Sequence, residues 1–256
     1  MKPVKRLLIS VLAFVSFLGC AEAKVTHYSV SVVKEYNHDS KAYTQGLFFW
    51  NGQLYESTGQ YGESSLRMVE LSTGRPLRKL DFASKYFVEG SVVLGDRLYV
   101  LTWRNKVVFV YDAETLEYKS TWSYPREGWG LTSDGNQLIA SDGSSTLYFM
   151  GTDFAVKKRL TVRYQGRPVN YLNELEYIDG KIWANVYTSD LIMIIDPDSG
   201  NVEGIVDCSD LLPDSLRTSE TDVLNGIAYD SESDKIYLTG KNWPRMYQIR
   251  LVRKYV

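Results

Sequence analysis

The sequence contains few of the residues that most often carry disulfide, metal or redox chemistry. It has two cysteines and two histidines among 256 residues. Two cysteines allow at most one disulfide, which cannot stabilise a chain of this length, so the fold must be held by a buried core. His27 and His38 lie near the N-terminus, fit no metal-ligand spacing, and fall outside the positions that a Ser-His-Asp triad would need. The sequence therefore predicts a protein with no metal and no cofactor.

An excess of either charge is also lacking. Lys and Arg number 29 and Asp and Glu 31, which gives a net charge of −2 and an isoelectric point near 5.8. This balance argues against nucleic acid as a partner, because phosphate-binding surfaces are strongly basic. Proline is scarce at 7, whereas tyrosine and glycine number 19 each and 44% of the residues are hydrophobic. That composition excludes a disordered chain and favours strands joined by tight turns.

The N-terminal segment, residues 1–23, has the pattern of a signal peptide. A basic stretch at residues 2–6 precedes an apolar run at residues 7–19, which is shorter than the roughly 20 helical residues needed to cross a bilayer. Ala21-Glu22-Ala23 then supplies a cleavage site. Removing the three basic residues and one acidic residue of this segment takes the net charge from −2 to −4. We expect export to the periplasm or cell envelope, with Lys24 as the first mature residue.

A second interpretation of the same segment stays open. Phe17-Leu18-Gly19-Cys20 resembles a bacterial lipobox, in which Cys20 becomes the lipid-bearing N-terminus. We expect a monomer, and a lipid on Cys20 would be its only attachment to a membrane. Under either cleavage Cys208 has no disulfide partner in the chain, so we expect it to be a buried thiol.

The rest of the chain, residues 24–256, repeats one pattern five times. Each copy contains a turn followed by a short apolar strand, and the copies recur roughly every 40–45 residues, with one longer interval. The turn-strand units are Asn51-Gly52-Gln53-Leu54-Tyr55, Gly95-Asp96-Arg97-Leu98-Tyr99, Gly135-Asn136-Gln137-Leu138-Ile139, Asp179-Gly180-Lys181-Ile182-Trp183 and Ser233-Asp234-Lys235-Ile236-Tyr237. Five copies at this period predict an all-β fold, a five-bladed β-propeller forming a single domain.

The fifth copy ends before it supplies a fourth, outer strand. The other copies provide one, at residues 76–82, 116–123, 156–164 and 202–207. Residues 26–36 alternate Val and Tyr with polar residues and are left over at the start of the mature chain. We expect this N-terminal strand to complete the last blade, which closes the ring and removes an open sheet edge. A short helix is expected within residues 211–217.

Aligning the copies brings one position per blade to the same level around the axis, because the first strand of each propeller blade lines the central channel. These positions are Gln45, Glu89, Trp129, Asn173 and Asn225. A neighbouring glycine in four of the five copies lets the strands approach closely. Interchangeable packing residues would give a uniform apolar ring. This ring is polar and irregular, which indicates a site.

A second aligned ring follows the turn-strand units and comprises Gly59, Trp103, Gly143, Tyr187 and Lys241. The two rings together predict a pocket with aromatic walls, one carboxylate, several amides and one ammonium. Such groups suit a ligand with a polar carbonyl. Asp142 and Asp196 lie in Ser- and Gly-rich stretches and are interpreted as turn residues.

Seven motifs, taken in order along the mature chain, resemble those of the plant and bacterial glutaminyl-peptide cyclotransferases. They are Tyr43-Thr44-Gln45-Gly46-Leu47, Phe87-Val88-Glu89-Gly90, Glu127-Gly128-Trp129-Gly130-Leu131, Asn173-Glu174-Leu175-Glu176, Trp183-Ala184-Asn185-Val186, Leu224-Asn225-Gly226-Ile227-Ala228 and Gly240-Lys241-Asn242-Trp243-Pro244. The resemblance implies a five-bladed propeller enzyme of the acyltransferase class. It also implies that N-terminal glutamine of peptides or proteins is converted to pyroglutamate and ammonia without catalytic zinc.

The resemblance further implies roles for individual residues. Glu89 falls on the family's catalytic acid/base, and Gln45, Asn173 and Lys241 fall on polar active-site positions. The aromatic, substrate-binding walls fall on Tyr43, Trp103, Trp129 and Tyr187. The family often has Phe in place of Tyr43 and Trp in place of Tyr187, so we expect a wall of different shape. The direction of the Glu89 pKa shift stays open, because burial raises it and Lys241 lowers it.

Two other functions are weighed against this one. The first is a non-enzymatic exported propeller that uses the same pocket to bind peptides or acts as a scaffold. The second is a glycosidase, which needs two carboxylates flanking the scissile bond. Glu176 is the obvious partner for Glu89, but strand alternation places it on the face opposite Asn173.

Overall fold

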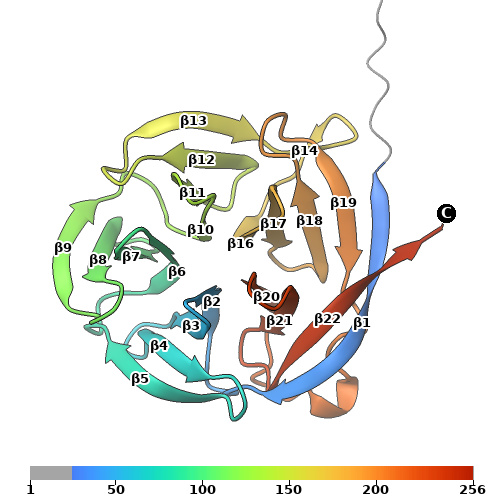
Figure 1. The fold of residues 1–256 in the computed structure, drawn as a ribbon, viewed down its shortest axis with the longest axis horizontal. Coiled ribbons are helices and arrows are strands. Elements are labelled where there is room, and N and C mark those ends of the chain that lie inside the picture. Colours follow the sequence, from blue (N-terminus) through green and yellow to red (C-terminus); the bar gives the residue numbers. More distant parts are fainter. Residues whose placement is uncertain (1–24, 256) are drawn as a thin grey trace, which may run out of the picture.

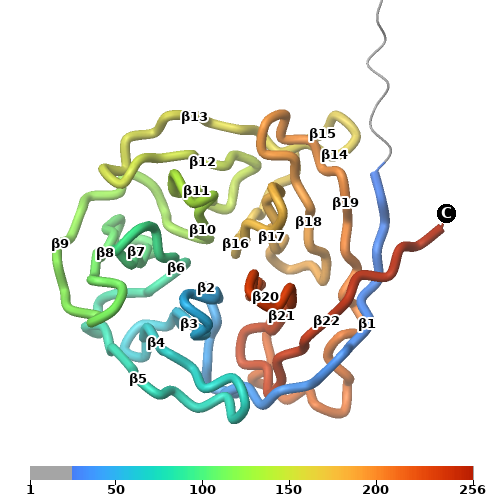
Figure 2. The backbone as a smooth tube through the Cα atoms, viewed as in Figure 1, coloured from blue at the N-terminus to red at the C-terminus, as the bar shows by residue number. Residues whose placement is uncertain are grey.

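The strands of the protein form sheets arranged in a ring around a central axis in the computed structural model, which describes residues 25–255 (Figure 1). The trace in Figure 2 passes once round the ring, so sheets that are consecutive in the chain are neighbours in space. The predictions of a signal peptide at residues 1–23 and of a lipidated Cys20 lie outside the described residues.

Three sheets contain four antiparallel strands each, in chain order from the centre outward. The first comprises β2 (Thr44–Trp50), β3 (Gln53–Thr58), β4 (Ser65–Glu70) and β5 (Arg75–Asp81). The second comprises β6 (Val88–Leu94), β7 (Arg97–Thr102), β8 (Val107–Asp112) and β9 (Tyr118–Ser123). The third comprises β10 (Leu131–Ser133), β11 (Leu138–Ala140), β12 (Thr146–Met150) and β13 (Val156–Thr161).

The rest of the ring belongs to one eight-stranded sheet. Its order is β16 (Leu172–Ile178), β17 (Lys181–Val186), β18 (Leu191–Ile195), β19 (Val202–Asp207), β1 (Thr26–Asn37), β22 (Arg245–Lys254), β21 (Lys235–Gly240) and β20 (Leu224–Asp230). The N-terminal strand β1 pairs antiparallel with β22, as the leftover stretch at residues 26–36 predicted. It also pairs in parallel with β19, which the sequence did not indicate.

Two local predictions need correction. The outer strand expected at residues 156–164 ends at Thr161, and Arg163–Tyr164 (β14) instead forms a small hairpin with Arg167–Pro168 (β15). The helix expected within residues 211–217 is a single 3-10 turn, Asp214–Leu216, which follows Pro213. No helix in residues 25–255 is long and apolar enough to cross a membrane.

Two-residue hairpins link β2 to β3, β6 to β7 and β16 to β17, where the sequence carries its turn signals. Asn51 and Gly52 both have positive φ (48° and 70°), and so do Asp179 and Gly180 (47° and 76°). Positive φ at both central residues gives the turn whose twist matches that of the flanking strands, and Asn, Asp and Gly adopt it most readily. The turn chemistry therefore sets the register of these strand pairs.

The core lies between neighbouring sheets. Cys208 is a free thiol buried in one apolar cluster, which confirms the prediction for it. Near the axis the sheets approach so closely that a Cβ added at Gly46 would lie 2.7 Å from the Ser91 amide nitrogen, and one at Gly130 would overlap the Asn173 carbonyl oxygen. The glycines beside the polar ring are thus required by backbone packing at the axis.

Candidate active site

One cavity of about 200 Å³ brings together all eight residues predicted for the site. It is lined by Tyr43, Gln45, Phe87, Glu89, Trp103, Trp129, Asn173, Tyr187 and Lys241. Phe87 was not among the predicted residues. It comes directly before β6 and opens the motif Phe87-Val88-Glu89-Gly90, which is the sequence signal that could have identified it. Asn225, a member of the first aligned ring, does not line this cavity.

The innermost strands carry their polar residues at irregularities in pairing. Register shifts fall at Thr44/Gly46, Val88/Ser91 and Leu172/Leu175, and each interval contains a cavity residue, namely Gln45, Glu89 or Asn173. A bulge leaves an extra residue unpaired and redirects its side chain. The bulges therefore explain how the inner strands present polar groups to the cavity while neighbouring residues stay in the core.

The second ring follows the second strand of the sheets. Trp103, Tyr187 and Lys241 come directly after β7, β17 and β21. Each backbone N–H donates to a carbonyl of the segment before the inner strand, at Phe87, Tyr171 and Val223 respectively (2.8–2.9 Å). These bonds fix the chain at the point where the three side chains enter the cavity.

The two glycines of this ring make room for aromatic rings. A Cβ at Gly59 would overlap the Phe87 ring, and a Cβ at Gly143 would lie 2.7 Å from the Trp129 ring. Trp129 meets Tyr187 edge-to-face, with centroids 5.7 Å apart and an interplanar angle of 88°. The missing side chains at Gly59 and Gly143 thus leave room for the rings of Phe87, from the next sheet, and of Trp129, from the same sheet as Gly143.

Glu89 is 5% exposed, and burial raises the pKa of its carboxyl well above the usual value. The Lys241 ammonium lowers this pKa and the Glu127 carboxylate raises it further. Burial therefore outweighs Lys241, which answers the question that the sequence left open. A carboxylate with a raised pKa is a stronger base than an ordinary glutamate, which suits it to accept a proton and return it.

Lys241 is 3% exposed, and its ammonium nitrogen lies 4.8 Å from the Tyr43 ring centroid and 5.1 Å from that of Tyr187. Burial lowers the pKa of Lys241, against the opposing effects of Glu89 and Asp222. Among the described residues, neither the Glu89 carboxyl nor the Lys241 ammonium forms a hydrogen bond or an ion pair. Two buried ionisable groups therefore face the cavity without a hydrogen bond or an ion pair to the described residues.

Residues behind the cavity orient its polar groups. The Asn225 amide donates to the Thr44 carbonyl (2.9 Å) and to Gln45 Oε1 (3.3 Å), which directs the amide nitrogen of Gln45 away from Asn225. Tyr43 donates its hydroxyl proton to Asp222 (2.8 Å), and its pKa is raised by burial and by this contact. Asn225 is therefore a neighbour that positions Gln45.

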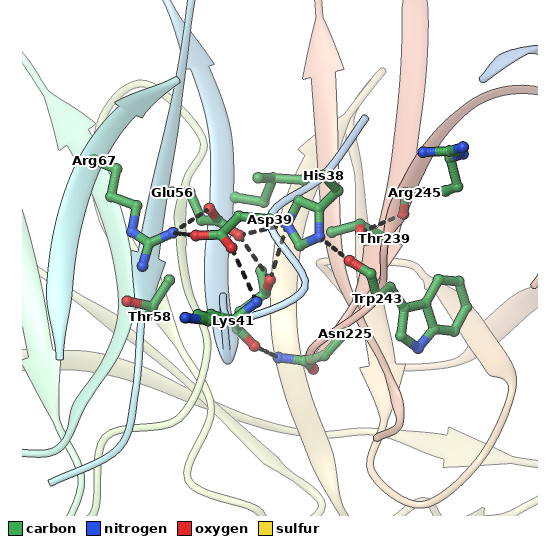
Figure 3. A network of polar contacts seen from close by, with 12 residues as sticks. His38, Asp39, Lys41, Glu56, Thr58, Arg67, Asn225, Thr239, Trp243 and Arg245 are labelled. Carbon is green, nitrogen blue, oxygen red and sulfur yellow. Dashed lines mark hydrogen bonds and ion pairs between the residues drawn. The ribbon is translucent and has the colours of Figure 1, made fainter. Parts of the chain in front are cut away.

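A buried ionic network supports the turn that carries Lys241 (Figure 3). His38, the residue after β1, places Nε2 2.8 Å from Glu56 Oε1 and Nδ1 2.6 Å from the Trp243 carbonyl oxygen. The Thr44 hydroxyl donates to the same Glu56 oxygen (2.7 Å), and the backbone N–H of Asn242 donates to the Ala42 carbonyl (2.8 Å). The connection from β1 to β2 is thereby joined to the Lys241 turn.

The remaining acidic candidates have structural roles. Asp142 and Asp196 accept bonds from the turn residues Ser144 and Ser199, which confirms that they are turn residues. The Glu176 carboxylate accepts a bond from the Tyr229 amide (2.9 Å) and does not line the Glu89 cavity. Glu176 therefore does not supply the second carboxylate that a glycosidase would need beside Glu89. Within residues 25–255, no three His, Cys, Asp or Glu side chains are grouped so as to hold a metal ion.

The fold and the site together define a class: an all-β, propeller-like protein with a small pocket that contains a carboxyl group, an ammonium group, amides and aromatic rings. A family model described as glutamine cyclotransferase matches residues 6–251. A glutaminyl-peptide cyclotransferase of Arabidopsis thaliana is 45% identical over 229 residues, which are 87% of this chain and 71% of that protein. The crystal structure of Myxococcus xanthus glutaminyl cyclase matches with a TM-score of 0.84 and 34% identity, covering 91% of this chain and 100% of that one. The chain belongs to the glutamine cyclotransferase family.

Proposed function

We propose that the protein converts the N-terminal glutamine of peptides or proteins to pyroglutamate and releases ammonia. The observation that carries this proposal is the pair of buried groups, Glu89 and Lys241, that face one small cavity without a hydrogen bond or an ion pair to the described residues. An acid/base and a cation in a cavity of about 200 Å³ suit a single small side chain. Membership of the glutamine cyclotransferase family supports the same activity.

In the proposed reaction the α-amine attacks the γ-amide carbonyl of the same residue. The enzyme must therefore hold glutamine in a bent pose and move protons. Glu89 as carboxylate takes a proton from the attacking amine and returns one to the departing ammonia. Its raised pKa brings it nearer to that of an α-amino group, about 7.7–8.0, which favours transfer in both directions.

The oxyanion that forms on the γ-carbonyl needs donors that are already in place. Lys241 supplies a positive charge, and the amides of Gln45 and Asn173 supply neutral donors. The Asn225 contact to Gln45 Oε1 leaves the Gln45 amide nitrogen available for this role. The walls Tyr43, Trp103, Trp129 and Tyr187 exclude water and so suppress hydrolysis to glutamate.

The proposal extends to the architecture and the setting of the enzyme. We count the eight-stranded sheet as two blades joined through β1 and β19, which with the three four-stranded sheets gives five. A signal peptide at residues 1–23 would direct export, and residues 24–256 would form a monomeric catalytic domain. N-terminal sequencing of the mature protein tests this, with Lys24 or a lipidated Cys20 expected and an intact Met1 contradicting both.

The activity is tested by measuring ammonia release and pyroglutamate formation from a Gln-led peptide with the purified mature protein. The matched controls are the same peptide led by Asn and the same peptide with an acetylated N-terminus. We expect turnover of the Gln-led peptide alone, and we expect it to survive prolonged treatment with a strong chelator. Binding without turnover would favour a peptide-binding module, and activity lost to the chelator and restored by zinc would contradict the metal-independent mechanism.

A further inference from the structure

One carboxylate connects two walls of the cavity. Glu127 Oε2 accepts a hydrogen bond from the indole N–H of Trp103 (2.8 Å) and another from the indole N–H of Trp129 (3.3 Å). Trp103 follows β7 of the second sheet, whereas Trp129 precedes β10 of the third. A single oxygen therefore joins two aromatic walls that come from different sheets.

The other side of Glu127 faces a cation. The guanidinium of Arg104 lies 3.9 Å from the Trp103 ring centroid, and its Nε lies 3.9 Å from Glu127 Oε1. The Glu127 side chain is 40% exposed, so it lies at the rim of the cavity while its bonded oxygen points to the walls. Arg104 and the two indoles can only donate hydrogen bonds, and an ionised carboxylate can only accept them. Glu127 is therefore complementary to its three neighbours.

We propose that Glu127 is a positioning residue that fixes both tryptophan walls of the cavity through one carboxylate oxygen. The inference rests on the proposed function for its kinetic consequences. Without Glu127 the two indoles lose their acceptor, the walls can rotate independently, and the bent pose of the substrate is less well enforced. The consequence for kinetics is a higher KM.

Glu127 has a second, electrostatic effect. It is the carboxylate whose charge adds to the effect of burial in raising the pKa of Glu89, while Lys241 opposes it. Replacing Glu127 by a neutral residue therefore lowers the pKa of Glu89. Since the reaction needs Glu89 ionised, the acid limb of kcat/KM moves to lower pH.

The two effects are separated by two substitutions. Glu127→Gln keeps an oxygen that can accept from the indoles but removes the charge, whereas Glu127→Ala removes both. For Glu127→Gln we expect KM within about threefold of wild type and an acid limb displaced to lower pH. For Glu127→Ala we expect the same displacement of the acid limb. We also expect KM to rise about tenfold, because the two indoles lose their hydrogen bonds to a charged acceptor. Glu117 is exposed and comes directly before β9, the outer strand of the second sheet. Glu117→Gln removes the same charge there and serves as the control.

An activity-independent readout distinguishes this inference from the proposed function. The indole N–H resonances of Trp103 and Trp129, assigned by Trp→Phe variants, should both shift in Glu127→Ala and be nearly retained in Glu127→Gln. If wild type releases no ammonia, the proposed function fails while these resonances still test the positioning role. A Glu127→Ala protein with wild-type KM and unmoved resonances would overturn the inference. Should this variant not fold, an acid limb unmoved in Glu127→Gln would overturn the electrostatic part.

Discussion

At the scale of single residues, the cavity contains two ionisable groups whose buried state is costly to maintain. Glu89 and Lys241 are each at most 5% exposed. Burial raises the pKa of Glu89 and lowers the pKa of Lys241, so it favours the neutral form of each group. Buried charges in proteins are normally paired or hydrogen-bonded. Among the described residues these two are not, which is the pattern expected of a site where a polar substrate supplies the missing partners.

Glu89→Gln tests the proton transfer directly. Gln has nearly the same shape, so packing and substrate binding should be kept, but it cannot accept and return a proton. Positioned acid/base groups contribute about 10²–10⁴-fold in rate, so we expect kcat to fall by about that factor with little change in KM. Turnover within a few fold of wild type would mean that another group moves the proton.

Lys241→Ala and Trp103→Ala should separate the two kinds of cavity residue. An oxyanion donor acts as charge develops, so Lys241→Ala should lower kcat by about 10²–10³-fold. A wall residue holds the ground state and the transition state alike, so Trp103→Ala should mainly raise KM. Steady-state kinetics with one Gln-led peptide measure both. Equal losses in kcat for the two variants would contradict this division of roles.

At the scale of strands and turns, sequence repeats predicted most of the fold and of the site. Residues at equivalent positions of equivalent blades lie at the same level, so alignment alone placed Gln45, Glu89 and Asn173 together. It could not predict the bulges that aim them, because a bulge depends on how many residues face each other across two strands. Glu127 was also missed. It lies outside the aligned positions, and its role depends on two indoles that only the folded chain brings to it.

Gly130→Ala tests the close approach of strands beside the site. Its Cβ would overlap the carbonyl of Asn173 and lie 2.9 Å from Leu175 Cγ, so β16 would have to move. Such overpacking costs about 1–3 kcal/mol, and displacement of Asn173 should lower kcat/KM as well. Gly135→Ala is the control, since its Cβ meets nothing within 4 Å and only its φ of +88° is unfavourable. Urea unfolding and kinetics on both variants check this, and equal activities would argue against a requirement for glycine at 130.

At the scale of the whole molecule, the N-terminal strand β1 closes the ring, and the residue after it connects the ring closure to the site. β1 pairs with both β19 and β22, and the residue that follows it, His38, bonds to Glu56 of the first sheet and to Trp243 of the Lys241 turn. Both ring nitrogens of His38 face oxygens that accept hydrogen bonds, a carboxylate and a carbonyl. A neutral imidazole has one N–H to donate, so this geometry indicates an imidazolium paired with an ionised Glu56.

The pH dependence of stability follows from this pair. Burial lowers the pKa of His38, but Glu56, the Trp243 carbonyl and Asp39 together raise it above 6.5. Burial likewise raises the pKa of Glu56, but His38, Arg67 and Thr44 bring it below 4.5. The His38 contribution is therefore complete below about pH 6.5 and is lost as pH rises through its folded pKa. The Glu56 contribution is complete above about pH 4.5 and is lost as pH falls through its folded pKa.

His38→Ala should thus destabilise the protein most between about pH 4.5 and 6.5. Removing one partner of a buried pair leaves the other charge uncompensated, which costs roughly 3–5 kcal/mol. His27→Ala, the other histidine, is the control, and urea unfolding at several pH values gives the free energies. We expect the difference between His38→Ala and wild type to shrink at high pH, where His38 is neutral in wild type too. A difference that is the same at pH 5.5 and at pH 9.5 would show that His38 contributes by packing alone, and that the turn carrying Lys241 does not depend on a charged imidazole.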